Sequence, residues 1–259
     1  MHGCAETPYA LGVLGIPAAS RACLFDLDGV LTRTAVVHAA AWKSMFDSVL
    51  ADRARRTGQP FVPFDAGHDY DEYVDGLPRA DGVRAFLASR GIALPDGAPG
   101  DPASAETVTG LGRRKNDLVL RLIHDRGVEA YPGSVGYLRA VREAGLNTAV
   151  VSSSTNCREV LEAVGIQDLF DARVDGVVAE QRGLRGKPAP DTFLEGARAV
   201  GAVPGEAVVF EDSLAGVAAG RAGAFGFVVG VDRVGQSAAL CDHGADVVVT
   251  DLAELLPPS

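Results

Sequence analysis

The chain has 259 residues, of which 47% are hydrophobic and 22% are charged, and its formal net charge is −10. This is the composition of a globular protein that is long enough for one large core or for two domains. The acidic balance argues against a protein that binds nucleic acid or an anionic membrane surface, because both partners require a basic face. We therefore expect no nucleic-acid partner and no membrane partner.

Segments that would direct or anchor the chain outside the cytoplasm are not predicted. No apolar run approaches the ~20 residues of a membrane span, and the start of the chain lacks the basic region of a signal peptide. The cysteines are widely scattered and form no CxxC pair, which is not typical of a disulfide framework or a zinc site. The sequence therefore predicts a cytoplasmic protein with reduced thiols at Cys4, Cys23, Cys157 and Cys241.

In chain order, an irregular leader over residues 1–20 precedes an apolar strand, ACLFDL, over residues 22–27. Helical spacing of apolar residues then dominates from about Val36 to Arg126, interrupted by a Pro/Gly/Asp-rich loop at 94–104. We expect helices here in VVHAAAWKSMFDSVL, ADGVRAFLASRGI and RRKNDLVLRLIHDRG.

After residue 130, short apolar runs alternate with helical segments. The runs LNTAVV, AVVF, GFVVGV and ADVVVT, with a short strand near ARVDGVV, alternate with helices at about 134–144 and in CREVLEAVG, DTFLEGARAVG and LAGVAAGRAG. This alternation is typical of a parallel sheet with helices on both faces. We therefore predict an α/β fold with a doubly wound parallel sheet, a core of residues 21–34 and 127–259, and an inserted helical cap over residues 35–126.

Polar residues follow the strands of the predicted core in four groups: Asp26 with Asp28, the run from Ser152 to Asn156, Lys187, and Glu211 with Asp212. Ligands bind beyond the carboxyl ends of the strands in such sheets, so we expect these groups to meet at one edge. Clustered carboxylates need a cation, and hard oxygen ligands favour Mg²⁺ over zinc. Ser152 and Lys187 would then bind phosphate oxygens, and one carboxylate would attack phosphorus to form an aspartyl-phosphate.

Each of these groups also has a structural interpretation when it is taken alone. Asp26 and Asp28 fit a turn, Glu211 and Asp212 fit the first turn of a helix, and the serine cluster fits a helix N-cap. A lysine before a proline, such as Lys187, fits a solvated loop. Their occurrence together favours catalysis.

Four motifs occur in order along the chain: DLDGV, a serine after the second strand, the lysine of KPAPD, and EDS. In these four motifs the chain resembles the haloacid dehalogenase superfamily of phosphoryl-transfer enzymes. The resemblance implies a Rossmann-like core with a cap inserted before the serine motif. It also implies that Asp26 is the nucleophile and that Asp28 is the general acid/base, which gives Mg²⁺ a backbone carbonyl. The implied phosphate ligands are Ser152, Ser153 and Lys187, and the implied metal ligands are Asp26, Asp28, Glu211 and Asp212.

Within this superfamily, the closer resemblance is to the β-phosphoglucomutases. The stretch DGVLTRTAVVHAAAW matches theirs from the acid/base aspartate into the cap, and DGLPRADG and RRKND match cap motifs. The resemblance implies hinge and substrate roles for Thr34, His38 and Trp42, a grip on the distal phosphate by Arg79, and a cap contribution from Lys115.

The residues alone leave other interpretations of the cap open: packing on one helix face for His38 and Trp42, a surface ion pair for Arg79, and a solvated helix start for Lys115. In the serine loop, SSSTN, Asn156 occupies the position of a phosphate-binding asparagine. Thr155 stands where the best-known form of the family has lysine.

The function implied by the resemblance is the Mg²⁺-dependent interconversion of β-glucose 1-phosphate and glucose 6-phosphate through a phosphorylated Asp26. The alternative is a sugar-phosphate phosphatase of the same superfamily, which forms the same intermediate. A third possibility is a non-catalytic phosphosugar-binding protein, against which the intact Asp26 and Asp28 argue. We expect a small sugar phosphate as the binding partner and a monomer or weak oligomer.

Overall fold

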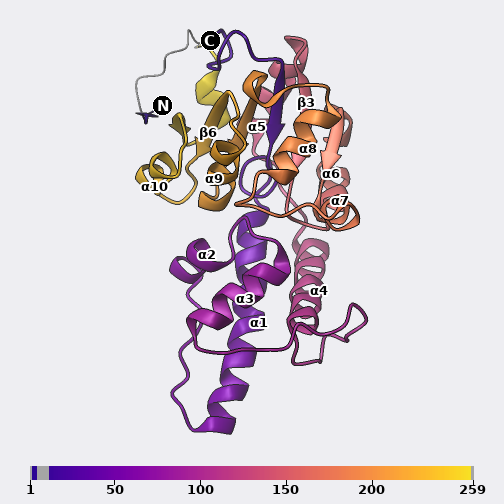
Figure 1. The fold of residues 1–259 in the computed structure, drawn as a ribbon, viewed down its shortest axis with the longest axis vertical. Coiled ribbons are helices and arrows are strands. Elements are labelled where there is room, and N and C mark those ends of the chain that lie inside the picture. The colour runs from indigo at the N-terminus through magenta and orange to yellow at the C-terminus, as the bar shows by residue number, and fades with distance from the viewer. Residues whose placement is uncertain (1, 5–11, 258–259) are drawn as a thin grey trace. The chain divides into compact units, whose positions relative to one another are not determined.

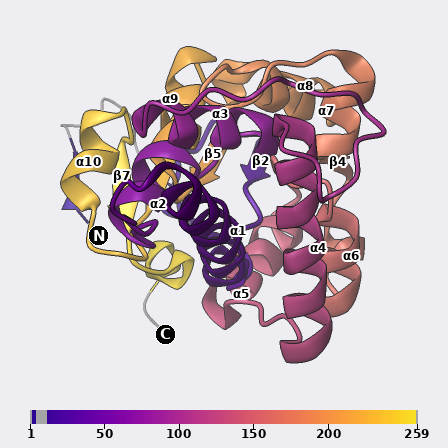
Figure 2. The same cartoon turned by 90° about the horizontal axis from the view of Figure 1, so that it is seen from below.

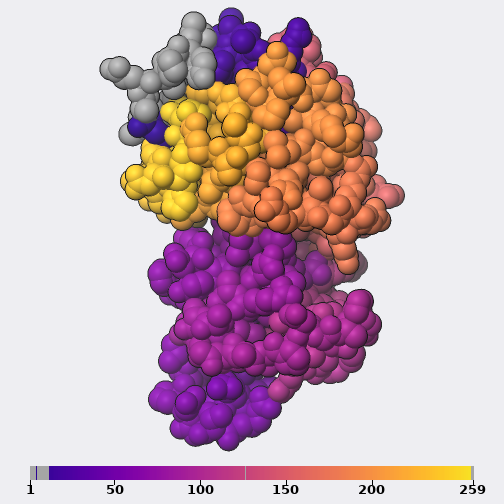
Figure 3. Space-filling view, viewed as in Figure 1, coloured from indigo at the N-terminus to yellow at the C-terminus, as the bar shows by residue number. Residues whose placement is uncertain are grey.

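The computed structural model of the chain describes residues 2–4 and 12–257 (Figure 1). The chain divides into two compact units, of which the first combines Met1–Arg33 with Val128–Ser259 and the second is Thr34–Gly127. In the space-filling view, the residues of the second unit, coloured violet to magenta, stay together as one body (Figure 3). None of the helices within the described residues is long and apolar enough to cross a membrane.

The first unit is built on one sheet, in the order β1-β7-β6-β5-β2-β3-β4 across the described residues. The strands are β1 (His2–Gly3), β2 (Ala22–Phe25), β3 (Asn147–Val151), β4 (Ala172–Val174), β5 (Ala207–Glu211), β6 (Phe227–Val231) and β7 (Val247–Val249). All pairs are parallel except β1 with β7. Strand β2 pairs with both β3 and β5, so Phe25 lies opposite Val150 and Phe210. The predicted parallel sheet, with its first strand joined to the later ones, is confirmed.

Helices cover both faces of this sheet (Figure 2). They are α5 (Pro132–Glu143), α6 (Cys157–Val164), α7 (Gly176–Arg182), α8 (Asp191–Ala199), α9 (Leu214–Ala222) and α10 (Ser237–Asp242). Because side chains alternate along a strand, Leu24 packs in the cluster with Phe193 of α8 and Val217 of α9, whereas Phe25 contacts Tyr137 of α5, with ring centroids 6.4 Å apart. The two apolar layers bury β2 on both faces, which is why it reads as a continuous apolar run.

The second unit is helical, with α1 (Thr34–Thr57), α2 (His68–Tyr73), α3 (Arg79–Ser89) and α4 (Val108–Arg126). Its core is aromatic: Phe46 stacks on Trp42 at 5.2 Å between centroids and contacts Phe86 at 4.2 Å. Helix α4 begins where the Thr107 hydroxyl accepts a hydrogen bond from the Gly110 amide. Spacing of large apolar residues on α1 and α3 therefore gives this unit a core of its own.

Several elements differ from the sequence prediction. The strand expected near ARVDGVV ends at Val174, because the Asp175 carboxylate accepts from the Val178 amide at 2.9 Å and starts α7. The helices α2 and α10 were not predicted, since six residues are too few to show a helical period.

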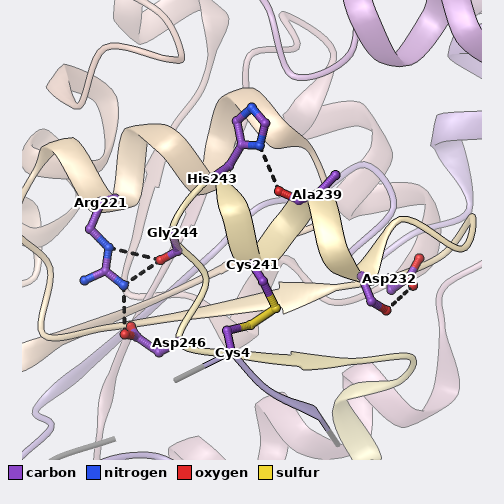
Figure 4. Close-up of a disulfide and its surroundings, with 9 residues drawn as sticks. Cys4, Arg221, Asp232, Ala239, Cys241, His243, Gly244 and Asp246 are labelled. Carbon is purple, nitrogen blue, oxygen red and sulfur yellow. Dashed lines mark hydrogen bonds and ion pairs between the residues drawn. A yellow bond between two sulfur atoms is a disulfide. The ribbon is translucent and has the colours of Figure 1, made fainter. Parts of the chain in front are cut away.

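The prediction that all four cysteines are reduced thiols is wrong. A disulfide joins Cys4 to Cys241, which are 237 residues apart in the chain (Figure 4). Spacing could not predict this pair, because it is the antiparallel addition of β1 to β7 that brings the two residues together. The free cysteines are Cys23 and Cys157, and burial raises the pKa of both thiols.

The predicted leader over residues 1–20 is not irregular throughout. Residues 2–3 form the edge strand β1, and the Cys4 amide donates to the Asp246 carbonyl at 3.2 Å. An edge strand of two residues carries no recognisable sequence period, so it was missed. Residue 1 and residues 5–11 of the predicted leader lie outside the described residues.

Candidate active site

A buried lysine joins the polar ends of two neighbouring strands. Asp26 directly follows β2, and its amide donates to the Phe210 carbonyl at 2.9 Å, which places it beside the end of β5, where Glu211 lies. Lys187 Nζ donates to Asp26 Oδ1 at 2.5 Å and to Glu211 Oε1. The Lys187 side chain is only 1% exposed, so it is not a solvated loop lysine.

Burial and neighbouring charges shift the pKa values of Asp26 and Lys187. Burial raises the pKa of the Asp26 carboxyl well above its ordinary range; Lys187 opposes that change, whereas Glu211 and Asp28 add to it. For Lys187, burial alone would lower the pKa of the ammonium, but the carboxylates of Asp26 and Glu211 outweigh burial and raise it. The lysine therefore stays charged, whereas burial shifts Asp26 toward its neutral form.

The loop after β5 orients Glu211 toward the lysine. Glu211 Oε2 accepts from both the amide and the hydroxyl of Ser213 at 3.0 Å. Ser213, and not either acid, is the N-cap of α9, since its hydroxyl accepts from the Gly216 amide at 3.0 Å. A Cβ on Gly216 would lie 1.9 Å from the Glu211 carboxyl group, so a glycine is required where the helix passes this carboxylate.

Asp212 faces the turn that carries Asp28. A Cβ on Gly29 would lie 1.7 Å from Asp212 Oδ2, and Gly29 also has φ +90°, which disfavours any side chain at this position. On the other side, the Ser152 hydroxyl donates to Asp28 Oδ2 at 3.4 Å. The ends of β2, β3 and β5 thus place Asp28, Ser152 and Asp212 around the same turn.

The serine loop after β3 is organised by its own hydroxyls. Ser152 Oγ accepts from the Ser154 amide at 3.0 Å, and Ser154 Oγ accepts from the Asn156 amide at 3.1 Å. Asn156 is buried at the N-cap of α6 without a side-chain capping bond, and Ser153 is half-buried. The cluster is therefore not a simple serine N-cap, and its residues stand beside the carboxylates.

The donor set suits Mg²⁺ by its chemistry. Asp26, Asp28 and Asp212 offer only oxygen ligands, which a hard cation such as Mg²⁺ prefers. Within residues 2–4 and 12–257, no three His, Cys, Asp or Glu side chains are already grouped as a metal site. Mg²⁺ is usually bound by one or two carboxylates, waters and a substrate phosphate instead of a complete protein cage.

In the helical unit, the structure brings together predicted residues that are far apart in the sequence. Lys115 Nζ lies 2.9 Å from His38 Nδ1 and 4.8 Å from the centroid of the Trp42 ring. Arg79 donates to the Asn116 side-chain oxygen at 2.8 Å. Lys115 is thus bound within its unit and is not a solvated lysine at a helix start.

Thr34 is the first residue of α1 and of the helical unit. It is buried, and it lies where the chain passes from one compact unit into the other. This is the position at which a hinge was expected from the resemblance.

Sequence reasoning missed several residues that touch these groups. Asn116 follows Lys115 directly and holds Arg79, so its place in RRKND was the available signal. Ser213 holds Glu211, and its position as the last letter of EDS was a similar signal. Arg233 and Gln236, which contact the loops of Asp28 and Asp212, lie in a stretch without a recognised motif.

Comparisons with known proteins agree with this arrangement. The family model of the haloacid dehalogenase-like hydrolases matches residues 20–223. A protein of Mycobacterium bovis named β-phosphoglucomutase is 59% identical over 247 residues, which cover 94% of each chain.

More distant relatives include enzymes with two different names. A crystal structure of β-phosphoglucomutase from Clostridium difficile has a TM-score of 0.70 and 26% identity, and covers 91% of this chain and 93% of that one. Hexitol phosphatase A of Escherichia coli is 27% identical over 203 residues, 77% of each chain. Mutases and phosphatases are therefore both present among the proteins that this chain resembles.

Proposed function

Because the chain belongs to the haloacid dehalogenase-like hydrolase family and to its β-phosphoglucomutase group, we propose that it interconverts β-glucose 1-phosphate and glucose 6-phosphate with Mg²⁺. The observation that carries the proposal is the buried contact of Lys187 with Asp26 and Glu211 at the carboxyl edge of the sheet. It sets a permanent cation against a carboxylate that can attack phosphorus.

Asp26 is the nucleophile in this proposal. Its carboxylate takes a phosphoryl group from a sugar bisphosphate, which leaves a sugar monophosphate, and then passes the group to the free hydroxyl of a sugar monophosphate, which forms the bisphosphate again. Asp28 removes the proton from the attacking hydroxyl and returns it to the leaving oxygen in the reverse direction. Lys187 and Ser152 hold the phosphoryl oxygens, and Ser153 and Asn156 complete the phosphate site.

Glu211 has a double assignment in this proposal. Both of its oxygens are used, one by Lys187 and one by Ser213, so it orients the lysine as well as adding charge to the metal site. Asp26, Asp212 and the Asp28 carbonyl would hold Mg²⁺, which, when bound, would neutralise the charge between these acids and the substrate phosphate.

Residues of the helical unit supply the second phosphate grip that a mutase needs. From the resemblance, we assign Arg79 to the phosphate that is not reacting and Lys115, His38 and Trp42 to the sugar phosphate. The pairing of Arg79 with Asn116 supports this assignment, because it orients a guanidinium whose planar fork of N–H donors matches a phosphate. Thr34 stands at the hinge.

Phosphorus NMR of the enzyme with β-glucose 1-phosphate, Mg²⁺ and a trace of glucose 1,6-bisphosphate tests the proposal. We expect glucose 6-phosphate to accumulate. Accumulation of inorganic phosphate instead would identify a phosphatase, the alternative that the similarity to hexitol phosphatase A favours. An unchanged spectrum would refute both activities for this substrate.

A further inference from the structure

Arg233, in the loop after β6, holds the turn that carries Asp28. Its Nε donates to the Gly29 carbonyl at 2.8 Å and its Nη2 to the Val30 carbonyl at 3.3 Å. The guanidinium also lies against the face of the Tyr131 ring, 3.6 Å from the centroid. One side chain therefore binds two consecutive peptides directly after the candidate acid/base.

The rest of the guanidinium is bonded to the loop after β7 and to α5. Nη1 donates to the Thr250 carbonyl at 2.5 Å and lies 3.5 Å from Asp251 Oδ2, and Nη2 also donates to Ser134 Oγ at 3.3 Å. The Arg233 side chain is only 14% exposed. An arginine that is mostly covered and makes several hydrogen bonds can hold the turn at a fixed place relative to the loop after β7 and to α5.

The turn is also closed by its own backbone. Gly29 donates to the Thr32 carbonyl at 2.8 Å, and the Thr32 amide donates to the Leu27 carbonyl at 3.0 Å. These bonds join residues of the turn to each other, so they set its shape more than its orientation at the edge of the sheet. Arg233 adds a fixed contact from outside the turn.

The same loop also reaches the candidate metal loop. Gln236 Nε2 donates to the Asp212 carbonyl at 3.1 Å. The loop is held in shape by Asp232, whose Oδ1 accepts from three backbone amides, those of Val234, Gly235 and Gln236. We call residues 232–237 the bracing loop, because its two longest polar side chains contact the loops after β2 and β5.

We propose that the bracing loop positions the reacting groups: Arg233 holds the turn of Asp28, and Gln236 holds the peptide of Asp212. This inference rests on the proposed function, since it assigns the contacts to proton transfer and metal binding. Arg233 and Gln236 are positioning residues that act through Asp28 and Asp212. The contact of Arg233 and the contact of Gln236 have different consequences, which can be tested separately.

The role of Arg233 is tested with two phosphoryl donors that have different leaving groups. We would measure first-turnover phosphorylation of Asp26 in Arg233→Met with two donors, glucose 1,6-bisphosphate and acetyl phosphate. A sugar alkoxide needs a proton from Asp28, whereas acetate leaves without one. Misplacing Asp28 should slow transfer from the bisphosphate about 10- to 100-fold, and transfer from acetyl phosphate by about threefold or less.

Equal losses with both donors would overturn the assignment, because they would indicate general damage to the fold, and parental rates with both would overturn it as well. Arg233→Lys serves as the second variant. It keeps the charge over Tyr131 but not the paired donors, so we expect a smaller loss with the same preference for acetyl phosphate. It decides the question if the methionine variant does not fold.

The role of Gln236 is tested by Mg²⁺ binding, which is measured by titration calorimetry of the free protein. Gln236→Ala should weaken Mg²⁺ about 10-fold or more without changing the ratio of the two donor rates. An unchanged Mg²⁺ affinity of the variant would overturn the role assigned to Gln236. A parental enzyme that binds Mg²⁺ but accepts phosphate from neither donor would show that the proposed function has failed, and the inference with it.

Discussion

Replacing Lys187 by methionine, which keeps the length of the side chain and removes its charge, is the most informative test of the site's energetics. In the parental protein, the ammonium bonds to Asp26 Oδ1 at 2.5 Å and to Glu211, and the Val151 carbonyl lies 3.4 Å away. The lysine and Glu211 side chains are each 1% exposed, and Asp26 is 9% exposed. The variant therefore leaves two buried carboxylates without their cation.

Breaking a buried ion pair by removing one partner costs about 3–5 kcal/mol, because the remaining charge is left without compensation. With an m-value of about 3 kcal/mol per molar urea, the unfolding midpoint should fall by about 1–1.7 M. Lys43→Met is the matched control. Lys43 pairs with Asp47 at 2.9 Å but is 43% exposed, and exposed pairs contribute only about 0–1 kcal/mol.

The destabilisation should depend on pH in a defined direction. Lys187 opposes the rise in the pKa of Asp26, so its removal raises that pKa further above the unfolded value of about 3.9. A carboxyl group whose pKa is higher in the folded than in the unfolded protein contributes its full stabilisation below the unfolded pKa. This stabilisation is lost as the pH rises through the folded pKa. The loss in Lys187→Met should therefore be largest near pH 8 and smaller near pH 5.

Urea unfolding followed by far-UV circular dichroism at both pH values measures this effect. Tryptophan fluorescence gives a separate signal for the helical unit, since Trp42 is the sole tryptophan of the chain. If Lys187→Met loses no more stability than Lys43→Met at either pH, the buried cluster does not have the charges that we assign to it.

Five further outcomes are expected. Asp26→Asn should abolish turnover without changing the circular dichroism spectrum, because an amide cannot attack phosphorus; residual turnover above one-thousandth would exclude Asp26 as nucleophile. Asp212→Ala should raise the Mg²⁺ concentration for half-maximal activity, and chelation should stop the parental enzyme reversibly; an unaltered Mg²⁺ requirement would remove Asp212 from the metal site. Arg79→Ala should lose isomerisation steeply, by about 1.5–3 kcal/mol for each charged hydrogen bond to phosphate that the variant cannot make, and should release more phosphate to water; parental values for both would make it a surface residue. In denaturant, two of the four thiols should react with a chromogenic disulfide reagent before reduction and all four after it; four reactive thiols without reduction would disprove the disulfide.

The sequence by itself determined the fold class and which residue types can carry chemistry. Apolar runs that alternate with helical spacing specify a parallel sheet with two covered faces. A strand that is buried on both faces is apolar at nearly every position, whereas a helix that packs on the sheet is apolar on one side only. The acids, serine and lysine at the ends of those runs were recognisable for the same reason, because the direction of a parallel strand decides which edge its last residues reach. Motif order then linked Asp26, Lys187 and Glu211 before any contact between them was known.

Only the tertiary structure decided which of these groups touch. The approach of Lys187 to both Asp26 and Glu211, and of Lys115 to His38, depends on packing between elements that are far apart in the chain. The same is true of Arg233 against the turn of Asp28 and of the disulfide from Cys4 to Cys241, which have no local pattern to reveal them. Hydrogen bonds and disulfides form between atoms that are close in space, and spacing along the chain records such closeness only when the partners share one element.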